Sequence, residues 1–419
     1  MKNRVWRLCQ GSVLILPFFP ALGELGLVVV MIAVWRSHWK QITRNFFNYY
    51  WLAFATWLII NSTLAYQPIE AWLGLANWLP FICLAIALSY VINSIERLIC
   101  LAWLLVIPAI LTVALGLGQL YLKWNSPAIV SNILGWELVA GGIPEGRMSS
   151  IFIYANFLAI YLVFTFVLSL GLCLYYWEES DRIAILILSL SLVFNSIGLL
   201  LANSRNSWLI AGLSCFCFAL YRGWYWLVSL FTAAIAVICG ASFGSFSGQV
   251  HLRKIVPEFI WSRLSDREFS DRPIETLRLT QWQFVWGKIQ EKPFVGWGLR
   301  NYTPLYLERS GYWFGHPHNL FLMLGMEIGI VATVFLCCIV GLILARAVYY
   351  CFFAKRKSLD SSKRIIVFTY LVTMVSCTVF NFFDVTLFDL RVNTISWIIL
   401  AAIWGISRQA TTLEINPKL

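Results

Sequence analysis

Long apolar runs recur along the whole of this 419-residue chain, and they constrain its fold more than any other feature. A helix needs about 18 to 20 consecutive apolar residues to cross the hydrocarbon core of a bilayer. A membrane β-barrel would instead show shorter segments of alternating polarity. Only 12% of the residues are charged, whereas about a quarter are charged in a soluble protein. The sequence therefore predicts an all-α polytopic membrane protein.

The apolar runs predict about twelve transmembrane helices. The first run, residues 8–35, is interrupted by Pro17, Pro20, Gly23 and Glu24 and has basic residues at both ends. These interruptions predict a hairpin of two short helices, with one continuous span as the alternative. The other spans are expected near residues 47–65, 71–93, 98–121, 151–177, 183–203, 207–221, 225–247, 319–347, 365–383 and 393–407.

The positions of the basic residues predict the orientation of these spans. Most Lys and Arg residues fall in short segments on the same side as the N-terminus, and such segments are typically cytoplasmic. Apart from the long loop 248–318, the opposite side carries only Lys123, Arg147, Arg205 and Arg391. We therefore expect both termini in the cytoplasm and the long loop in the periplasm. The net charge of +11 follows from this topology, so we expect no nucleic-acid partner.

The long loop divides the chain into three predicted regions of one membrane domain. These are an N-terminal transmembrane bundle (1–247), a large periplasmic loop with amphipathic helices (248–318), and C-terminal transmembrane helices with a cytoplasmic tail (319–419). Residues 275–286, ETLRLTQWQFVW, have the pattern of a helix lying on a membrane surface. All eleven cysteines lie in or beside apolar runs, which predicts no disulfide framework. No zinc spacing, Walker loop or HExxH motif is present, so we expect neither a metal nor a cofactor.

Three arginines on the predicted outer side are candidates for binding an anion. Arg205 stands in a short turn between two apolar runs, Arg278 lies in the long loop, and Arg147 precedes a span. A guanidinium group can donate two parallel hydrogen bonds to a phosphate. The structural alternatives are a snorkelling side chain for Arg205, an ion pair with Glu275 for Arg278, and an interface anchor for Arg147.

The segment FGHPHNLFLMLGMEIG, residues 314–329, supplies a candidate base. Pro317 suits the first position of a helix, which would place His318 in the first turn of the span 319–347. The positive end of the helix dipole lies there and favours a neutral imidazole, which can accept a proton. His316 is the weaker candidate of the two. Glu327 is an acid expected deep in the bilayer, where charged groups are often functional.

Together these segments resemble the O-antigen ligase family. The motifs that carry the resemblance are Arg205 followed by Leu209, Arg278 followed by PFVGWG at 293–298, and His318–Asn319 followed by Gly329. The segment RMSSIFIYANFLAIYL, residues 147–162, is similar to a further family region. Ser150 and Ala155 stand in it where the family commonly has glycine and proline, and Ala332 replaces a second glycine after Gly329. Asp384, Asp389 and Arg391 lie between the last two predicted spans.

The resemblance implies a GT-C-like membrane glycosyltransferase of the bacterial inner membrane with its active site at the periplasmic face. It implies transfer of a glycan from undecaprenyl diphosphate to a hydroxyl group of a glycan or lipid acceptor. The enzyme would contact membrane lipid, and the reaction would need no metal. Arg205 and Arg278 would bind the diphosphate and His318 would act on the acceptor, with Arg147, Asn319 and Glu327 as secondary candidates. A polymerase of O-antigen or exopolysaccharide is one alternative, since only its acceptor differs. A transporter of a small anion such as bicarbonate is an alternative of another class.

Overall fold

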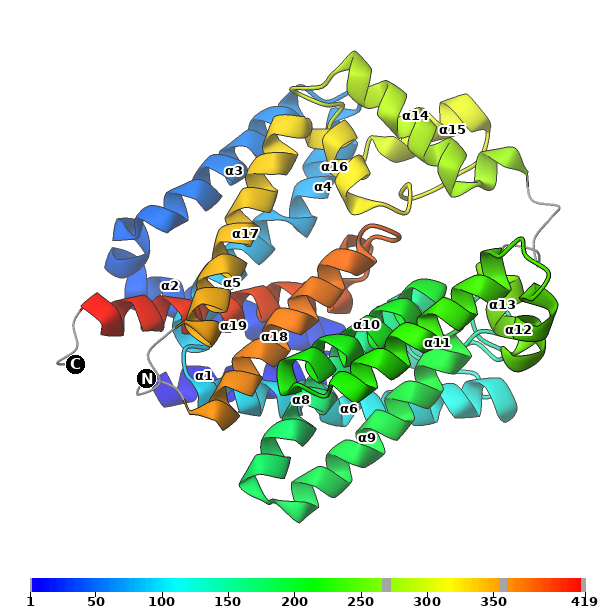
Figure 1. The fold of residues 1–419 in the computed structure, drawn as a ribbon. Coiled ribbons are helices and arrows are strands. Elements are labelled where there is room, and N and C mark those ends of the chain that lie inside the picture. Colours follow the sequence, from blue (N-terminus) through cyan, green and yellow to red (C-terminus); the bar gives the residue numbers. More distant parts are fainter. Residues whose placement is uncertain (1, 266–272, 354–359, 416–419) are drawn as a thin grey trace.

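The structure is a computed structural model that describes residues 2–265, 273–353 and 360–415 (Figure 1). These residues form helices and connecting segments without a β-strand, which confirms the predicted all-α class for this part of the chain. The first eleven helices are α1 (Lys2–Ile15), α2 (Pro20–Arg44), α3 (Phe46–Thr63), α4 (Pro68–Gly74), α5 (Leu79–Val91), α6 (Ile95–Tyr121), α7 (Ala128–Leu134), α8 (Ala155–Glu179), α9 (Arg182–Ala202), α10 (Arg205–Arg222) and α11 (Tyr225–Phe243). The others are α12 (Gln249–Ile255), α13 (Glu258–Leu264), α14 (Arg278–Glu291), α15 (Tyr302–Ser310), α16 (Leu320–Ile328), α17 (Ile330–Phe352), α18 (Ser361–Phe380) and α19 (Leu390–Ile415), with short 3-10 turns η1 (Leu75–Asn77), η3 (Ile274–Thr276) and η4 (Thr386–Phe388).

Nine helical segments in the described ranges are long and apolar enough to cross a membrane. The chain is therefore a multi-pass membrane protein, with fewer such segments than the predicted twelve or so. Three predicted spans are not among the nine. Helix α1 has 14 residues, and α3 and α10 have 18 residues each but contain polar side chains such as Asn48 and Arg205.

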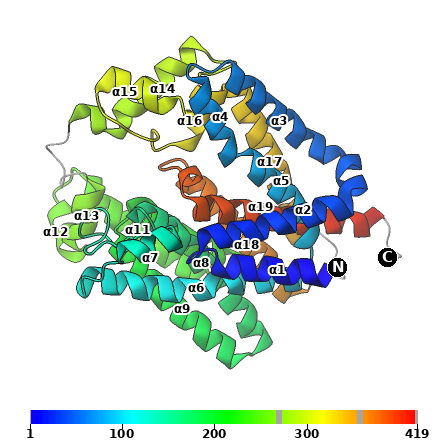
Figure 2. The same ribbon diagram turned by 180° about the vertical axis from the view of Figure 1, so that it is seen from behind.

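The N-terminal helices α1 and α2 form the predicted hairpin, and the two helices lie side by side in both views of the ribbon (Figures 1 and 2). Pro20 occupies the first turn of α2. Glycines allow the close approach, because a Cβ at Gly26 would lie 2.1 Å from Ser12 Oγ and one at Gly23 would lie 2.9 Å from Leu16 Cα. Helix α2 has 25 residues, so the second helix is longer than predicted.

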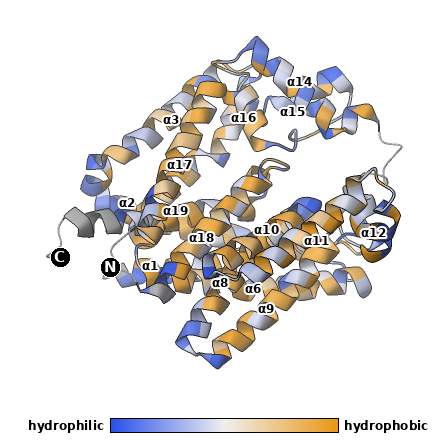
Figure 3. Cartoon of the chain, viewed as in Figure 1, coloured by the Kyte–Doolittle hydropathy of each residue, from blue (hydrophilic) through white to orange (hydrophobic). Residues whose placement is uncertain are grey.

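Helix α19 runs from the middle of the molecule toward the C-terminus at its edge (Figures 1 and 2), and it packs against α5, α17 and α18. In its membrane-length part 94% of the residues are buried, which identifies α19 as the core helix of the bundle. Aromatic rings join it to α3, with the ring of Trp51 5.7 Å from Trp397 and 6.3 Å from Trp404. Apolar residues predominate along helices such as α9 and α18, and hydrophilic residues gather at helix ends and connecting segments (Figure 3).

The predicted span 319–347 is interrupted at Gly329, so the prediction of one continuous helix is wrong. Gly329 separates α16 from α17 with φ +84° and ψ 156°, a conformation that is essentially restricted to glycine. The segment PFVGWG closes the break. The amide of Ile330 donates to Pro293 O at 2.8 Å, and the amides of Trp297 and Gly298 donate to carbonyl groups at the end of α16. These bonds replace the helical bonds that the break removes.

The long loop folds back onto α16 through the helix that the sequence predicted, now seen as α14. The buried residues of α14, Gln281, Val285 and Ile289, repeat every four positions and line one face. Val285 and Ile289 pack with Tyr302 of α15 and Met326 of α16 in a separate apolar cluster. One face of the amphipathic helix thus packs against α15 and α16, whereas Leu279 and Trp286 are exposed on it.

Candidate active site

A cavity of about 620 Å³ lies between the folded-back loop and the helices α8 and α10. Five segments that are distant in the sequence contribute to its wall. They are the segment before α8 with its first turn (Arg147, Tyr154, Asn156), the α9–α10 turn (Asn203, Ser204, Arg205, Asn206), the start of α14 (Thr276, Leu277, Arg278, Leu279), the segment before α16 (Phe314, His318) and the α18–α19 connection (Phe383, Asp384). The structure therefore brings Arg147, Arg205, Arg278 and His318 together.

Two of the arginines begin helices. Arg205 is the first residue of α10 and Arg278 is the first residue of α14. The positive ends of both helix dipoles therefore lie at the cavity, together with backbone N–H groups that have no partner within their helix. A cation at this end of a helix is unfavourable by about 0.3–1 kcal/mol, whereas an anion is favourable. The arrangement concentrates positive potential in the cavity and is suited to a multiply charged anion.

The third arginine, Arg147, is fixed by the protein on two sides. Its Nε donates to the carbonyl oxygen of Ala202 at 2.9 Å, and its Nη2 donates to Asn156 Oδ1 at 2.6 Å. The segment that carries it contains Ser150 with φ +50°, in the left-handed region. In the sequence resemblance, this is a position where the O-antigen ligase family commonly has glycine, a residue that adopts the left-handed region readily.

His318 lies just outside α16, so the prediction that it occupies the first helical turn is wrong. The helix begins at Leu320, and Asn319 caps it through a hydrogen bond from the amide of Leu322 to Asn319 Oδ1 at 3.0 Å. Asparagine is among the preferred cap residues, and here it determines the start of the helix instead of Pro317. His318 itself has φ +55°, which is uncommon outside glycine. Such strained residues cluster at active sites.

Asp384 holds the ring of His318. Its Oδ1 lies 3.3 Å from His318 Nδ1, and its Oδ2 accepts a hydrogen bond from Asn156 Nδ2 at 2.6 Å. Burial raises the pKa of Asp384, but the hydrogen bond from His318 and the electrostatic interactions with His318, His316 and Arg278 outweigh it, so the pKa lies well below its usual value. An ionised Asp384 accepts a hydrogen bond from Nδ1–H of His318, which leaves Nε2 as the nitrogen with a free electron pair.

His316 supports the same cluster from the other side. Its Nδ1 accepts a hydrogen bond from the amide of His318 at 3.1 Å, and its ring stacks on Phe388. Burial lowers the pKa of His316 to about 4, and the nearby Asp384 offsets only part of that effect. His316 is therefore neutral at physiological pH. Because Nδ1 is an acceptor, the proton of the neutral ring is on Nε2, which lies 3.7 Å from Asp384 Oδ1.

His316, His318 and Asp384 are of residue types that commonly bind metal ions. One ligand atom from each of His316, His318 and Asp384 lies within 4.8 Å of the other two. A metal at His316 Nε2 would require that nitrogen to lose its proton, yet the amide of His318 directs its own proton at Nδ1. The hydrogen-bond pattern thus favours the tautomer with a proton on Nε2, which cannot bind a metal through that nitrogen.

Two sequence candidates lie outside the cavity wall. Asn319 acts as the cap of α16, as described above. Glu327, which is 2% exposed, lies near the end of α16 and its Oε1 is 3.5 Å from the amide nitrogen of Tyr302 at the start of α15. Its partner is thus the backbone of the long loop. No sequence pattern predicts the contact between Asn156 and Asp384.

These features define the class of the protein: a multi-pass helical membrane protein with a cationic cavity that also contains a histidine–aspartate pair. Residues 190–337, from α9 into α17, match the family model described as O-Antigen ligase. This match supports the O-antigen ligase family, which in general implies an enzyme of the membrane glycosyltransferase type. The match covers Arg205, Arg278 and His318, whereas Arg147 and Asp384 lie outside it. A comparison with curated proteins finds no match.

Proposed function

We propose that this protein transfers a glycan from undecaprenyl diphosphate to an acceptor hydroxyl at the outer face of the bacterial inner membrane. The observation that carries the proposal is that Arg147, Arg205, Arg278 and His318 line one cavity. A lipid diphosphate is an anion that this cavity suits, and a saccharide hydroxyl is a group that a neutral imidazole can deprotonate. The matched family gives no support to the anion-transporter alternative.

The arginines would act on the leaving group. As the bond between the anomeric carbon and the diphosphate oxygen breaks, its electron pair goes to that oxygen and adds negative charge. Guanidinium groups and helix N-termini that are already in place stabilise this charge without reorganisation. Arg205 and Arg278 supply both features, because each begins a helix.

His318 would act on the acceptor. The hydroxyl oxygen attacks the anomeric carbon, and the hydroxyl proton passes to Nε2 of His318. The imidazolium that forms is stabilised by Asp384 at Nδ1. Positioned bases of this kind typically contribute about 10²–10⁴-fold to a rate. A polymerase would use the same steps with a second lipid-linked glycan as the acceptor.

The reaction is expected to be independent of metal ions, because the arginines can neutralise the diphosphate and the protonation of His316 does not suit a metal. Purified protein should retain its transfer activity after treatment with EDTA. Loss of activity that returns on addition of Mg²⁺, Mn²⁺ or Zn²⁺ would contradict this part of the proposal.

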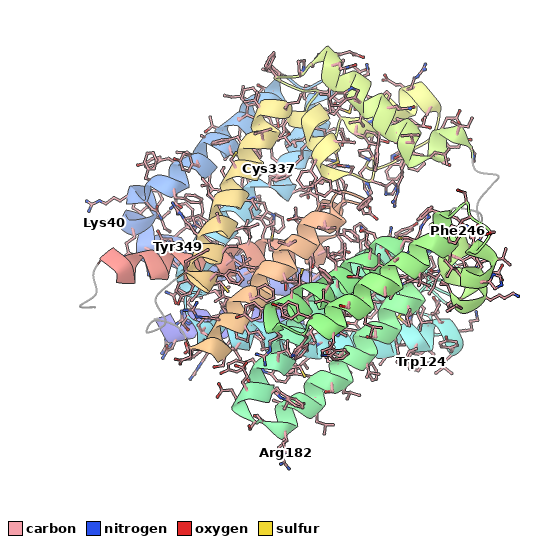
Figure 4. The ribbon with its side chains drawn as sticks, in the orientation of Figure 1. Lys40, Trp124, Arg182, Phe246, Cys337 and Tyr349 are labelled. Carbon is pink, nitrogen blue, oxygen red and sulfur yellow. The ribbon has the colours of Figure 1, made fainter. Side chains whose placement is uncertain are left out.

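The proposal is tested by glycan transfer in nanodiscs from a lipid-diphosphate donor, with separate lipid and lipid-linked glycan acceptors. Arg205→Ala, Arg278→Ala and His318→Ala should each lose activity. Arg182→Ala is the matched control, because Arg182 begins α9 as Arg205 begins α10 but lies at the far end of the bundle (Figure 4). Full activity of the three cavity variants would refute the site. The acceptor that is used distinguishes ligase from polymerase.

A further inference from the structure

We infer that Asn156 is a positioning residue of the reaction, which joins Arg147 to Asp384 and thereby holds Asp384 against His318. The inference rests on the proposed transfer reaction and adds to it a residue outside the matched region. Asn156 is the second residue of α8 and is half-buried in the cavity wall. Asn156 stands in the segment RMSSIFIYANFLAIYL, which is similar to a further region of the O-antigen ligase family.

The three side chains form one continuous chain of hydrogen bonds. Arg147 Nη2 donates to Asn156 Oδ1 at 2.6 Å, and Asn156 Nδ2 donates to Asp384 Oδ2 at 2.6 Å. The other oxygen of Asp384 lies 3.3 Å from His318 Nδ1. It also accepts a hydrogen bond from the amide of Val385 at 3.0 Å. Both oxygens of the carboxylate are thus held, one by Asn156 and the other by His318 and the backbone.

An amide is the group that this position requires. Arg147 can only donate, so it must face the oxygen of Asn156, and this orients the NH₂ group toward Asp384. An ionised Asp384 can only accept, which matches the NH₂ group. A carboxylate at residue 156 could still accept from Arg147, but it could not donate to Asp384. The orientation of the amide is therefore determined by its two charged neighbours.

Charged and titratable groups surround Asp384 on several elements. His316 and His318 face it from the segment before α16, Arg278 acts on it from the start of α14, and Arg147 reaches it through Asn156. Arg205 lines the same cavity from α10.

Without Asn156, Oδ2 of Asp384 loses its hydrogen-bond donor and the carboxylate can turn. His318 then loses the hydrogen-bond acceptor that keeps its proton on Nδ1. Nε2 is then no longer kept unprotonated, as a base must be.

The test compares Asn156→Ala and Asn156→Asp with the wild type in the nanodisc transfer assay across a pH range. Asn156→Ala should lower kcat by about 10- to 100-fold, the range seen for groups that orient a reacting side chain, with little change in KM for the donor. In Asn156→Asp, two carboxyl groups would face each other at hydrogen-bond distance. A proton taken up at lower pH lets residue 156 donate to Asp384 again.

The activity of Asn156→Asp relative to wild type should therefore rise as the pH falls. Asn132→Asp, the same change at an exposed position of α7, should follow the wild type at every pH. A merely structural role of Asn156 would give a ratio that does not change with pH, and this result would overturn the inference. His318→Ala in the same assay keeps the two proposals separate. An active His318→Ala variant would refute the proposed site itself, whereas an inactive one beside a pH-independent Asn156→Asp ratio would refute only the role of Asn156.

Discussion

Replacement of Gly329 by alanine should disrupt the break between α16 and α17, and with it the packing of the PFVGWG segment against the end of α16. A Cβ at this position would lie 2.0 Å from Phe294 O and 2.5 Å from Phe294 C, which are backbone atoms that cannot move alone. The conformation, with φ +84° and ψ 156°, costs a non-glycine residue about 1–3 kcal/mol.

Relief of the overlap requires the PFVGWG segment to move away. That movement weakens the hydrogen bonds from Ile330 to Pro293 and from Trp297 to Met326, each of which contributes about 0.5–1.5 kcal/mol. The strain and the two bonds together suggest a loss of roughly 2–6 kcal/mol. We therefore expect a large fall in the thermal transition of the purified protein and reduced transfer activity.

Gly341→Ala provides the matched control for this measurement. Gly341 lies within α17, and a Cβ there would meet no atom within 4 Å. Alanine in a helix is favoured over glycine by about 0.5–1 kcal/mol, so this variant should be as stable as the wild type or more stable. The reasoning would be refuted if Gly329→Ala and Gly341→Ala had the same thermal transition, measured by intrinsic tryptophan fluorescence in detergent.

Three further predictions follow from the cluster and from Glu327. Burial lowers the pKa of His316 from 6.5 to about 4, so the unfolded chain takes up this proton first and stability should fall as the pH drops from 6.5 toward 4. His316→Asn should reduce that slope in a pH series of thermal melts, and an unchanged slope would contradict it. Asp384→Asn should lower kcat by at least about 100-fold while donor binding, measured separately, stays near wild type. Glu327→Gln should keep near wild-type activity, because an amide oxygen can still accept from Tyr302, and a strong loss of activity would show that the acid itself is needed.

The sequence predicts the helical class, and it predicts that Arg205, Arg278 and His318 lie on the same side of the membrane. It does not predict the break at Gly329. The run LFLMLGMEIGIVATVFL is apolar on both sides of this glycine, so hydropathy reads it as one span. The break depends on φ at Gly329 and on hydrogen bonds from a segment that lies about thirty residues earlier in the chain. Hydropathy contains no information about either.

Part of the candidate site could likewise be predicted from the sequence, and part could not. Arg205, Arg278 and His318 could be selected because a resemblance marks them and the predicted topology places them on one side. The link between Asn156 and Asp384 spans 228 positions, and no local pattern connects the two residues. From the sequence, Glu327 is expected to be an acid deep in the bilayer without a recognisable partner. Its partner is the backbone amide of Tyr302, and no sequence pattern indicates such a contact because every residue except proline has this group.

Donor binding in Arg205→Ala, Arg278→Ala, His318→Ala and Arg182→Ala tests most directly the proposal that this cavity binds a lipid diphosphate and that His318 acts on the acceptor. The affinity for undecaprenyl diphosphate would be measured by native mass spectrometry or by titration in nanodiscs. A lost charged hydrogen bond is worth about 1.5–3 kcal/mol, so Arg205→Ala and Arg278→Ala should each weaken binding by about 10- to 100-fold. His318→Ala and Arg182→Ala should bind as the wild type does, and only His318→Ala should fail to transfer glycan. Equal affinity in Arg205→Ala, Arg278→Ala and Arg182→Ala would contradict the account.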